Sequence, residues 1–212
     1  MPTSLLIVDD HRVFCQGLEA VFAGEPDFEP MAISDPDQVL RAVAARRPDA
    51  VLMDVRLGEV SGVDLTRQLM ALPFPPAIVV LTAYADVPLA LDAIRAGAVG
   101  FVAKSASVEQ VIGAVRAAVL GGSWLPPELV TKLVAEYPDS AGAPQLIAQL
   151  TAREQQILSL MVSGLDRGGI AARLHQSPNT VRTHIRNVIV KLGCHSAIEA
   201  VAVGLQAGLR PQ

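Results

Sequence analysis

The sequence has few cysteines, few aromatic residues and no long apolar segment. Cys15 and Cys194 lie far apart and belong to no Cys-x-x-Cys or Cys/His cluster, so neither a disulfide framework nor a cysteine-bound zinc site is expected. No apolar run approaches the roughly 18 residues of a membrane-spanning helix. The apolar stretch Ser4–Val8 is too short for a signal peptide and follows no basic segment. We therefore expect a cytoplasmic protein with free, buried thiols and no membrane partner.

Charge is distributed unevenly along the chain, whose 212 residues permit one or two domains. Residues 1–147 carry ten basic and 18 acidic side chains, a net charge of −8. Residues 148–212 carry seven basic and three acidic side chains, a net charge of +4. This asymmetry favours nucleic-acid binding by the C-terminal part alone, although chance also produces a net charge of this modest size.

Short apolar runs alternate with amphipathic stretches over the first 120 or so residues. This alternation predicts βα units, and hence a doubly wound, five-stranded parallel sheet with right-handed crossovers. The expected strands cover residues 4–9, 28–33, 50–54, 77–82 and 99–103. The expected helices cover residues 11–24, 35–46, 62–70, 86–96 and 107–120, and residues 55–61 are expected to form a loop.

Polar side chains follow four of these strands: Asp9 and Asp10, then Asp54, Thr82 and Lys104. Ligands of such sheets bind beyond the carboxyl ends of the strands, so we expect these side chains to converge. Any one of these residues alone is most often a solvated polar residue at a strand end. That explanation does not account for all of them together. Three gathered carboxylates require a divalent cation, and their hard oxygen ligands suit Mg²⁺. Attack by the Asp54 carboxylate on a phosphoryl group would then give an aspartyl phosphate, with Thr82 and Lys104 binding phosphoryl oxygens.

This pattern resembles the receiver domain of two-component response regulators. The segment 97–104, Gly-Ala-Val-Gly-Phe-Val-Ala-Lys, is similar to that family's Gly-Ala-x-Gly-aromatic-x-x-Lys signature. The resemblance covers residues 1 to about 120 and implies a CheY/flavodoxin-like fold. It also implies that Asp54 is the phosphoacceptor for a sensor histidine kinase. The other implied site residues are the Mg²⁺ ligands Asp9, Asp10, Asp54 and Arg56 (backbone carbonyl), and the phosphoryl-binding or switch residues Thr82, Lys104 and Phe101.

The loop after Asp54 departs from the family pattern. The family usually has Met-Pro-Gly-x-x-Gly, whereas residues 57–62 here read Leu-Gly-Glu-Val-Ser-Gly. Loss of the proline predicts a looser loop beside the metal, and Glu59 adds a negative charge there. We therefore expect an altered Mg²⁺ affinity and phosphoryl lifetime. One alternative is a degenerate receiver in a DNA-binding regulator that works without phosphorylation.

A second alternative is a Mg²⁺-dependent phosphohydrolase. Enzymes that resemble the haloacid dehalogenase family form an aspartyl phosphate on a similar sheet. They carry a second aspartate two residues after the nucleophile, which acts as the general acid. That position holds Arg56 in this chain, so the general acid is missing and we do not expect an enzyme.

The C-terminal part contains only helical signals. Thr151-Ala152-Arg153-Glu154 forms a capping box for a helix that Gly164 ends. A short helix is expected over residues 170–174, a longer one over 178–192 and a last one after Ser196. We predict an all-α, four-helix domain over residues 148–212. A receiver would occupy residues 1–121, and residues 122–147 would form a linker with a short helix at 128–137.

The helix 178–192 carries two stripes of opposite character. Its core stripe contains Val181, Ile185, Val188 and Leu192. Its polar stripe contains arginine and asparagine but no acid, and these side chains read guanine, adenine or phosphate in DNA. A solvated helix face would show a similar stripe, but the preceding short helix and tight turn fit a helix-turn-helix. The candidate DNA-binding residues are Asn179, Thr180, Arg182, Thr183, Arg186, Asn187 and Lys191.

The surrounding motifs resemble the LuxR-type helix-turn-helix of NarL/FixJ regulators. They are Leu-Thr-Ala-Arg-Glu at 150–154, Gly-Leu at 164–165, Thr-Val-Arg-Thr-His-Ile at 180–185 and Lys-Leu-Gly at 191–193. The resemblance implies a transcription regulator that forms a homodimer when phosphorylated. Residues 166–169, Asp-Arg-Gly-Gly, depart from the family's Asn-Lys-Glu-like run, so weak or divergent DNA binding is expected. The implied dimerisation residues on the last helix are Ile198, Val201, Ala202 and Leu205.

Overall fold

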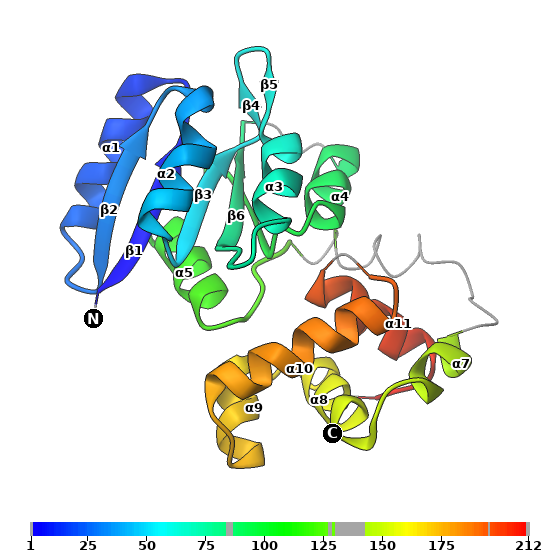
Figure 1. Ribbon diagram of the computed structural model, residues 1–212. Helices are drawn as coiled ribbons and strands as arrows, with labels where there is room; N and C mark the ends of the chain where they lie inside the picture. The colour runs from blue at the N-terminus through cyan, green and yellow to red at the C-terminus, as the bar shows by residue number, and fades with distance from the viewer. Residues whose placement is uncertain (1, 84–86, 127–128, 130–142, 195, 211–212) are drawn as a thin grey trace.

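The computed structural model describes residues 2–83, 87–126, 129, 143–194 and 196–210. An α/β part precedes a helical part (Figure 1). The five strands of the main sheet are parallel and lie in the order β2-β1-β3-β6-β7, which confirms the predicted doubly wound sheet. Their bounds are β1 Thr3–Val8, β2 Phe28–Ile33, β3 Ala50–Asp54, β6 Ala77–Thr82 and β7 Gly100–Ala103.

Helices cover both faces of this sheet. Alternate residues of β1 divide between two apolar clusters, because successive strand side chains point to opposite faces. Leu5 and Ile7 pack with α1 and α5, whereas Leu6 and Val8 pack with α2, α3 and α4. The helix bounds are α1 Arg12–Ala23, α2 Val39–Arg46, α3 Gly62–Met70, α4 Val87–Arg95 and α5 Val108–Val119. A strand such as β3 is therefore buried along its whole length, and its polar end must emerge at the sheet edge.

The expected loop at residues 55–61 contains a small antiparallel hairpin instead. Its strands are β4 (Arg56–Leu57) and β5 (Val60–Ser61), joined by the two residues Gly58 and Glu59. Gly58 has a φ of 64°, and a glycine with positive φ at the first loop position is typical of a tight hairpin turn. Strands of two residues are too short to show an alternating pattern in the sequence, which is why the hairpin was missed.

The start of the second predicted helix also differs in detail. The carboxylate of Asp35 accepts the N–H of Asp37 and begins a 3₁₀ turn, η1 (Pro36–Gln38), from which α2 continues. After β7 the chain adds one more pairing, because the N–H of Phe101 donates to the carbonyl of Trp124 at 2.8 Å. The Trp124 ring packs against Gly113 of α5.

Over residues 143–194 and 196–210 the C-terminal part is all helical, as predicted, with one helix more than the four expected. The additional helix α7 is six residues long and falls within the expected linker, where Pro144 in its first turn concealed it. Its Ala143 packs in the core of the helical part with Val188 and Leu192. The short helix expected at 128–137 lies outside the described residues, apart from Leu129. The bounds are α7 Ala143–Ala148, α8 Ala152–Val162, α9 Arg167–Leu174, α10 Pro178–Lys191 and α11 Ala197–Gln206.

Helix α9 starts three residues earlier than predicted, so Gly168 and Gly169 are helical. Each glycine costs up to about 1 kcal/mol relative to alanine in a helix. The N-cap Asp166 opposes this cost, because its carboxylate accepts the N–H of Gly169 at 2.7 Å. None of the helices in the described ranges has the length and apolarity that crossing a membrane requires.

Candidate functional site

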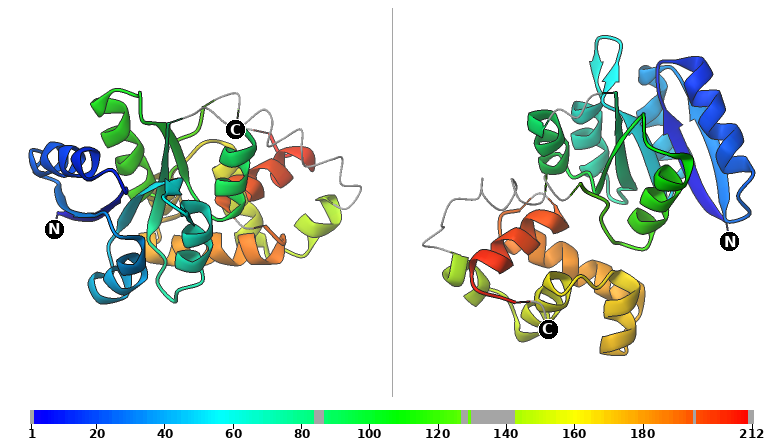
Figure 2. Two further views of the ribbon diagram at one scale, coloured as in Figure 1. Left: turned by 90° about the horizontal axis from the view of Figure 1, so that it is seen from above. Right: turned by 180° about the vertical axis from the view of Figure 1, so that it is seen from behind.

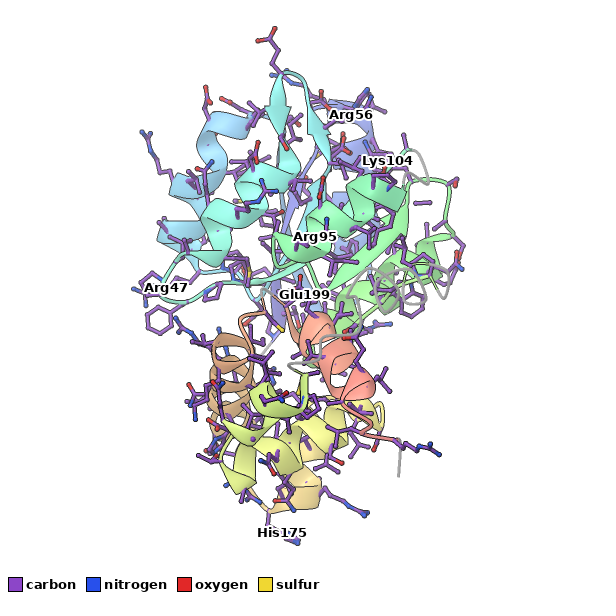
Figure 3. All side chains as sticks on the ribbon, turned by 90° about the vertical axis from the view of Figure 1, so that its right-hand side faces the viewer. Arg47, Arg56, Arg95, Lys104, His175 and Glu199 are labelled. Carbon is purple, nitrogen blue, oxygen red and sulfur yellow. The ribbon has the colours of Figure 1, made fainter. Side chains whose placement is uncertain are left out.

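The predicted site residues meet at the carboxyl edge of the sheet. Asp9 and Asp10 follow β1, Asp54 ends β3, Thr82 ends β6 and Lys104 follows β7. Since β1, β3, β6 and β7 are successive neighbours in the sheet, their ends lie side by side. Figure 3 shows Lys104 and Arg56 at the end of the α/β part that lies away from the helical part.

Lys104 joins the acidic residues. Its Nζ lies 2.7 Å from Oδ2 of Asp9 and 2.7 Å from Oδ2 of Asp54, and both carboxylates are buried. Its backbone N–H donates to the carbonyl of Thr82 at 2.7 Å, which fixes the start of the segment after β7. The ring of Phe14 completes the surroundings, with its centroid 4.9 Å from the ammonium in a cation–π contact.

These surroundings shift the pKa of Asp54 and that of Lys104. Burial raises the pKa of Asp54 above its ordinary value, although the hydrogen bond from Lys104 acts in the opposite direction. Burial lowers the pKa of Lys104, but its hydrogen bonds to Asp54 and Asp9 outweigh that effect and raise it overall. The ammonium therefore stays charged, and the Asp54 carboxylate depends on nearby positive charge to remain ionised.

The acidic cluster fits a hard divalent cation. Asp9, Asp10, His11 and Asp54 each offer one ligand atom, and these atoms lie within 4.8 Å of one another. Oδ2 of Asp9 and Oδ1 of Asp10 are buried, and they lie 2.7 Å from Nζ of Lys104 and 2.8 Å from Nδ1 of His11, respectively. Oxygen ligands of this kind, at such short separations, suit Mg²⁺. Arg56 starts β4, its side chain is exposed, and its N–H donates to Oδ1 of Asp54 at 3.3 Å.

The hairpin β4–β5 is tied to this cluster by backbone hydrogen bonds. The N–H of Gly58 donates to Oδ2 of Asp10 at 2.9 Å, and the N–H of Gly62 donates to the carbonyl of Val55 at 2.8 Å. A Cβ atom on Gly62 would lie only 1.9 Å from the carbonyl oxygen of Asp54, so glycine is required there. The hydrogen bond of Gly58 thus attaches the hairpin to the acidic cluster. The altered Mg²⁺ affinity and phosphoryl lifetime stay predictions.

Three contributors to the site were missed in the sequence. His11 directly follows the acidic pair, and its Nδ1 lies 2.8 Å from Oδ1 of Asp10. Phe14 falls within the expected helix 11–24 and was given no role in the site, and Gly58 was treated as part of a loop. Thr82 and Phe101, the expected switch pair, are both buried, with 3% and 5% of their surface exposed. Proximity to the Asp-Asp pair was the only available signal for His11, whereas nothing in the sequence marks a backbone donor.

The second candidate site is the exposed face of α10. Val181, Val188 and Leu192 are buried and Ile185 is half-buried, which confirms the predicted core stripe. Each of the seven candidate DNA-binding residues is exposed. They are Asn179, Thr180, Arg182, Thr183, Arg186, Asn187 and Lys191.

Lys191 is already paired with an acidic side chain. Its Nζ lies 2.7 Å from Oε2 of Glu154, a buried residue whose carboxylate also accepts the N–H of Thr151. Burial raises the pKa of Glu154, but the hydrogen bonds from Lys191 and Thr151 lower it below its ordinary value overall. Lys191 therefore joins α10 to the start of α8, and its charge is less available to DNA than that of Arg182 or Arg186.

The helical part touches the α/β part through α10 and α11, which form its side facing the sheet (Figures 1 and 2). Ile198 of α11 packs with Leu91 and Ile94 of α4, and Leu125 packs against the same cluster. Arg182 donates from Nη2 to the carbonyl of Pro75 at 3.3 Å. The face that would read DNA is thus partly covered by the loop before β6.

A second polar contact lies beside it. Arg167 at the start of α9 donates from Nη2 to the carbonyl of Val119, at the end of α5, at 2.8 Å. Gly121 permits this approach, because a Cβ there would lie 2.6 Å from Cβ of Arg167. Burial and the nearby Arg182 charge lower the pKa of Arg167, so two like charges are held at this contact.

The expected dimerisation residues are divided between surface and interior. Ile198 is covered by α4, and Ala202 is buried in the helical part. Val201 is half-buried and Leu205 is exposed. An apolar stripe on α11 thus serves the core and the contact with α4, and the sequence alone cannot distinguish these from a dimer interface.

Comparison with known proteins covers both parts of the chain. Residues 5–116 match the family described as "Response regulator receiver domain", and residues 148–203 match "Bacterial regulatory proteins, luxR family". The chain is 30% identical to the transcriptional regulatory protein LiaR of Bacillus subtilis, over 92% of this chain and 93% of the relative. It is also 30% identical to the DNA-binding transcriptional activator DevR/DosR of Mycobacterium tuberculosis, over 92% and 91%.

Solved structures give the same result for the fold. The response regulator ChrA of a heme-sensing two-component system aligns with a TM-score of 0.51 at 29% identity, over 98% of both chains. Full-length FixJ from B. japonicum aligns with a TM-score of 0.52 at 24% identity, over 97% of both chains. Both similarities extend over the α/β part and the helical part together.

Proposed function

Because the chain belongs to the NarL/FixJ family of response regulators, which are DNA-binding transcription regulators and not enzymes, we propose that phosphorylation of Asp54 controls it. The phosphoryl donor would be a sensor histidine kinase, and the outputs would be dimerisation and DNA binding. The observation that carries this proposal is the position of Asp54. It is a buried carboxylate at a strand end, paired with Lys104 at 2.7 Å beside two further acids.

The site residues divide the chemistry among themselves. A carboxylate oxygen of Asp54 attacks phosphorus, the P–N bond to the kinase histidine breaks, and the imidazole leaves with the bonding electrons. Lys104 and Thr82 then bind phosphoryl oxygens at the ends of β7 and β6. Asp9, Asp10, Asp54 and the carbonyl of Arg56 would hold Mg²⁺, which supplies neutralising charge when bound.

Helix α4 provides a physical connection from this site to the helical part. It starts at Val87, shortly after Thr82, and its Leu91 and Ile94 contact Ile198. A rearrangement of Thr82 and Phe101 around a phosphoryl group would displace α4 and weaken that contact. Separation would uncover Ile198 for dimerisation and Arg182 for DNA. Two α10 helices in a dimer would then reach half-sites about 34 Å apart.

This proposal assigns roles to three stretches of the chain. Residues 1–121 act as the receiver and residues 148–212 as the DNA-binding domain. Residues 122–147 connect them, with α7 beginning before the second domain. On α11, the exposed Leu205 and half-buried Val201 would join Ile198 and Ala202 at the dimer interface.

The test combines intact-mass spectrometry with sedimentation. The wild-type chain and Asp54→Asn are incubated with acetyl phosphate and Mg²⁺. The wild type should gain the mass of one phosphoryl group and shift towards a dimer, and Asp54→Asn should do neither. Absence of any phosphorylated species would favour the alternative, a DNA-binding regulator that works without phosphorylation. An equal mass gain by Asp54→Asn would move the modification to another residue.

A further inference from the structure

We propose that the backbone amide of Gly58 positions Asp10 for the metal. This role rests on the proposed receiver function, since it concerns the same site. The turn of the hairpin β4–β5 brings the N–H of Gly58 to Asp10. The proline that the family usually carries at this position has no N–H and could not donate this hydrogen bond. Gly58 is thus a positioning residue that acts through Asp10.

The first step of the argument concerns the two oxygens of Asp10. Oδ2 accepts the N–H of Gly58 at 2.9 Å, whereas Oδ1 is buried and lies 2.8 Å from Nδ1 of His11, an exposed side chain. The side chain of Asp10 is 30% exposed, so without the Gly58 amide its Oδ2 could turn towards water. The Gly58 amide prevents this rotation and leaves the other oxygen facing the cluster.

Asp9 shows the same arrangement on the other side of the site. Its Oδ1 accepts the N–H of His11 at 2.9 Å, and its Oδ2 pairs with Nζ of Lys104 at 2.7 Å. Each acid therefore uses one oxygen for a backbone amide and presents the other to the cluster. Of these two backbone donors, the Gly58 amide is the one at a position where this sequence departs from the family pattern.

The second step explains why this position is glycine. At a φ of 64°, glycine has no steric penalty, whereas proline is fixed near −65° and has no N–H. A Cβ on Gly58 would meet nothing within 4 Å, so the requirement is for backbone conformation and for a donor, not for space. The single change from proline to glycine thus permits the tight turn and supplies the hydrogen bond.

The third step gives the expected size of the effect. Hydrogen bonds to a metal ligand fix its orientation, and their loss typically lowers metal affinity by about 10- to 100-fold. The amide also brings partial positive charge to one of three clustered carboxylates, which favours their close approach. Removing it should therefore weaken Mg²⁺ binding by roughly tenfold, the lower end of that range.

The test measures Mg²⁺ binding to the unphosphorylated full-length chain by isothermal titration calorimetry. The double variant Gly58→Pro/Glu59→Gly restores the family's Pro-Gly, and Glu59→Gly alone controls for the lost charge. Gly58→Asn is the conservative rescue, because asparagine tolerates positive φ and keeps its N–H. We expect the double variant to bind roughly tenfold more weakly than Glu59→Gly, and Gly58→Asn to bind like the wild type. Equal binding by the double variant and Glu59→Gly, or an equal loss with Gly58→Asn, would overturn the proposal.

A second measurement decides the matter if the double variant does not fold. In the wild type, the Gly58 amide proton should exchange with solvent more slowly than that of Glu59, and Asp10→Ala should remove this protection. Equal exchange at both amides in the wild type would overturn the proposal. Neither experiment uses a phosphodonor, so failure to phosphorylate Asp54 would refute the proposed function and leave the role of Gly58 standing.

Discussion

At the scale of single residues, the site depends on a balance of buried charge. Lys104 is shared between Asp9 and Asp54, and it is the ammonium that offsets their repulsion. Backbone amides bind one further oxygen of each acid: the N–H of His11 donates to Asp9, that of Arg56 to Asp54 and that of Gly58 to Asp10. This balance leaves little room for displacement of the backbone around Asp54.

The substitution Gly62→Ala tests whether the backbone around Asp54 tolerates displacement. The added Cβ would lie 1.9 Å from the carbonyl oxygen of Asp54, and neither backbone segment can move as a flexible side chain would. We expect the free energy of unfolding to fall by about 1–3 kcal/mol, measured by urea denaturation. Gly17→Ala is the matched control, because its Cβ meets nothing within 4 Å in the helix α1, and it should stabilise by roughly 0.5–1 kcal/mol. Unchanged stability in Gly62→Ala would contradict the geometry.

The sequence was informative about side chains and uninformative about backbone donors. Asp9, Asp54 and Lys104 were placed together because each follows a recognisable apolar strand, and parallel strands end at one edge. Gly58 was missed because it contributes a backbone N–H in an unusual conformation. Residue type alone does not indicate which backbone N–H groups will donate to a site. Phe14 was missed because a phenylalanine suits both an apolar helix face and a cation–π contact, so the residue type does not distinguish the two roles.

At the scale of elements, long periodic segments were predicted and short irregular ones were not. The sheet and the helices beside it were expected because their apolar periods persist over a strand or several turns. The hairpin β4–β5 and the helix α7 have too few residues to show a period. Helix α9 begins at Arg167 because the Asp166 cap outweighs the poor helix propensity of two glycines, a competition that composition alone does not resolve.

The connection between α8 and α10 makes a prediction about pH. Glu154 has a lowered pKa in the folded chain, so its stabilising contribution is present above its ordinary value of 4.5 and is lost as pH falls through the folded value. Lys191→Met removes its ion pair. We expect a lower free energy of unfolding than in the wild type near pH 7, and a difference that shrinks as pH falls below about 4.5.

The measurement is urea denaturation followed by circular dichroism over a series of pH values. Arg173→Met, which removes an exposed charge from the neighbouring helix α9, serves as the control and should show no such dependence. A difference between Lys191→Met and the wild type that stays constant across this range would contradict the role given to Glu154.

At the scale of the whole molecule, the structure shows a closed arrangement in which the contacts of α10 and α11 compete with their proposed functions. Ile198 packs on α4, and Arg182 donates to the loop before β6. The sequence could not predict this arrangement, since contacts between two domains leave no periodic pattern of their own. Burial of Arg167 lowers its pKa, so closing this contact carries a desolvation cost for that charge.

Leu91→Ala should favour the open arrangement. Leu91 packs on Ile198, and burial of a leucine side chain contributes about 1.5–3 kcal/mol. Without phosphodonor, we expect the variant to dimerise at least about tenfold more readily than the wild type in sedimentation, since a factor of ten corresponds to about 1.4 kcal/mol. Leu89→Ala is the matched control on the same helix, because Leu89 packs on the sheet core instead. Equal dimerisation by the two variants would argue against α4 as the restraint.

The most direct test of the central claim is DNA binding as a function of Asp54 phosphorylation. DNA sites are selected from a random duplex library with the phosphorylated wild-type chain and then used in mobility-shift titrations. Acetyl phosphate with Mg²⁺ should raise the affinity of the wild type by at least about tenfold, or about 1.4 kcal/mol, and leave Asp54→Asn unchanged. Equal binding by both proteins, with and without the phosphodonor, would contradict control of DNA access by Asp54.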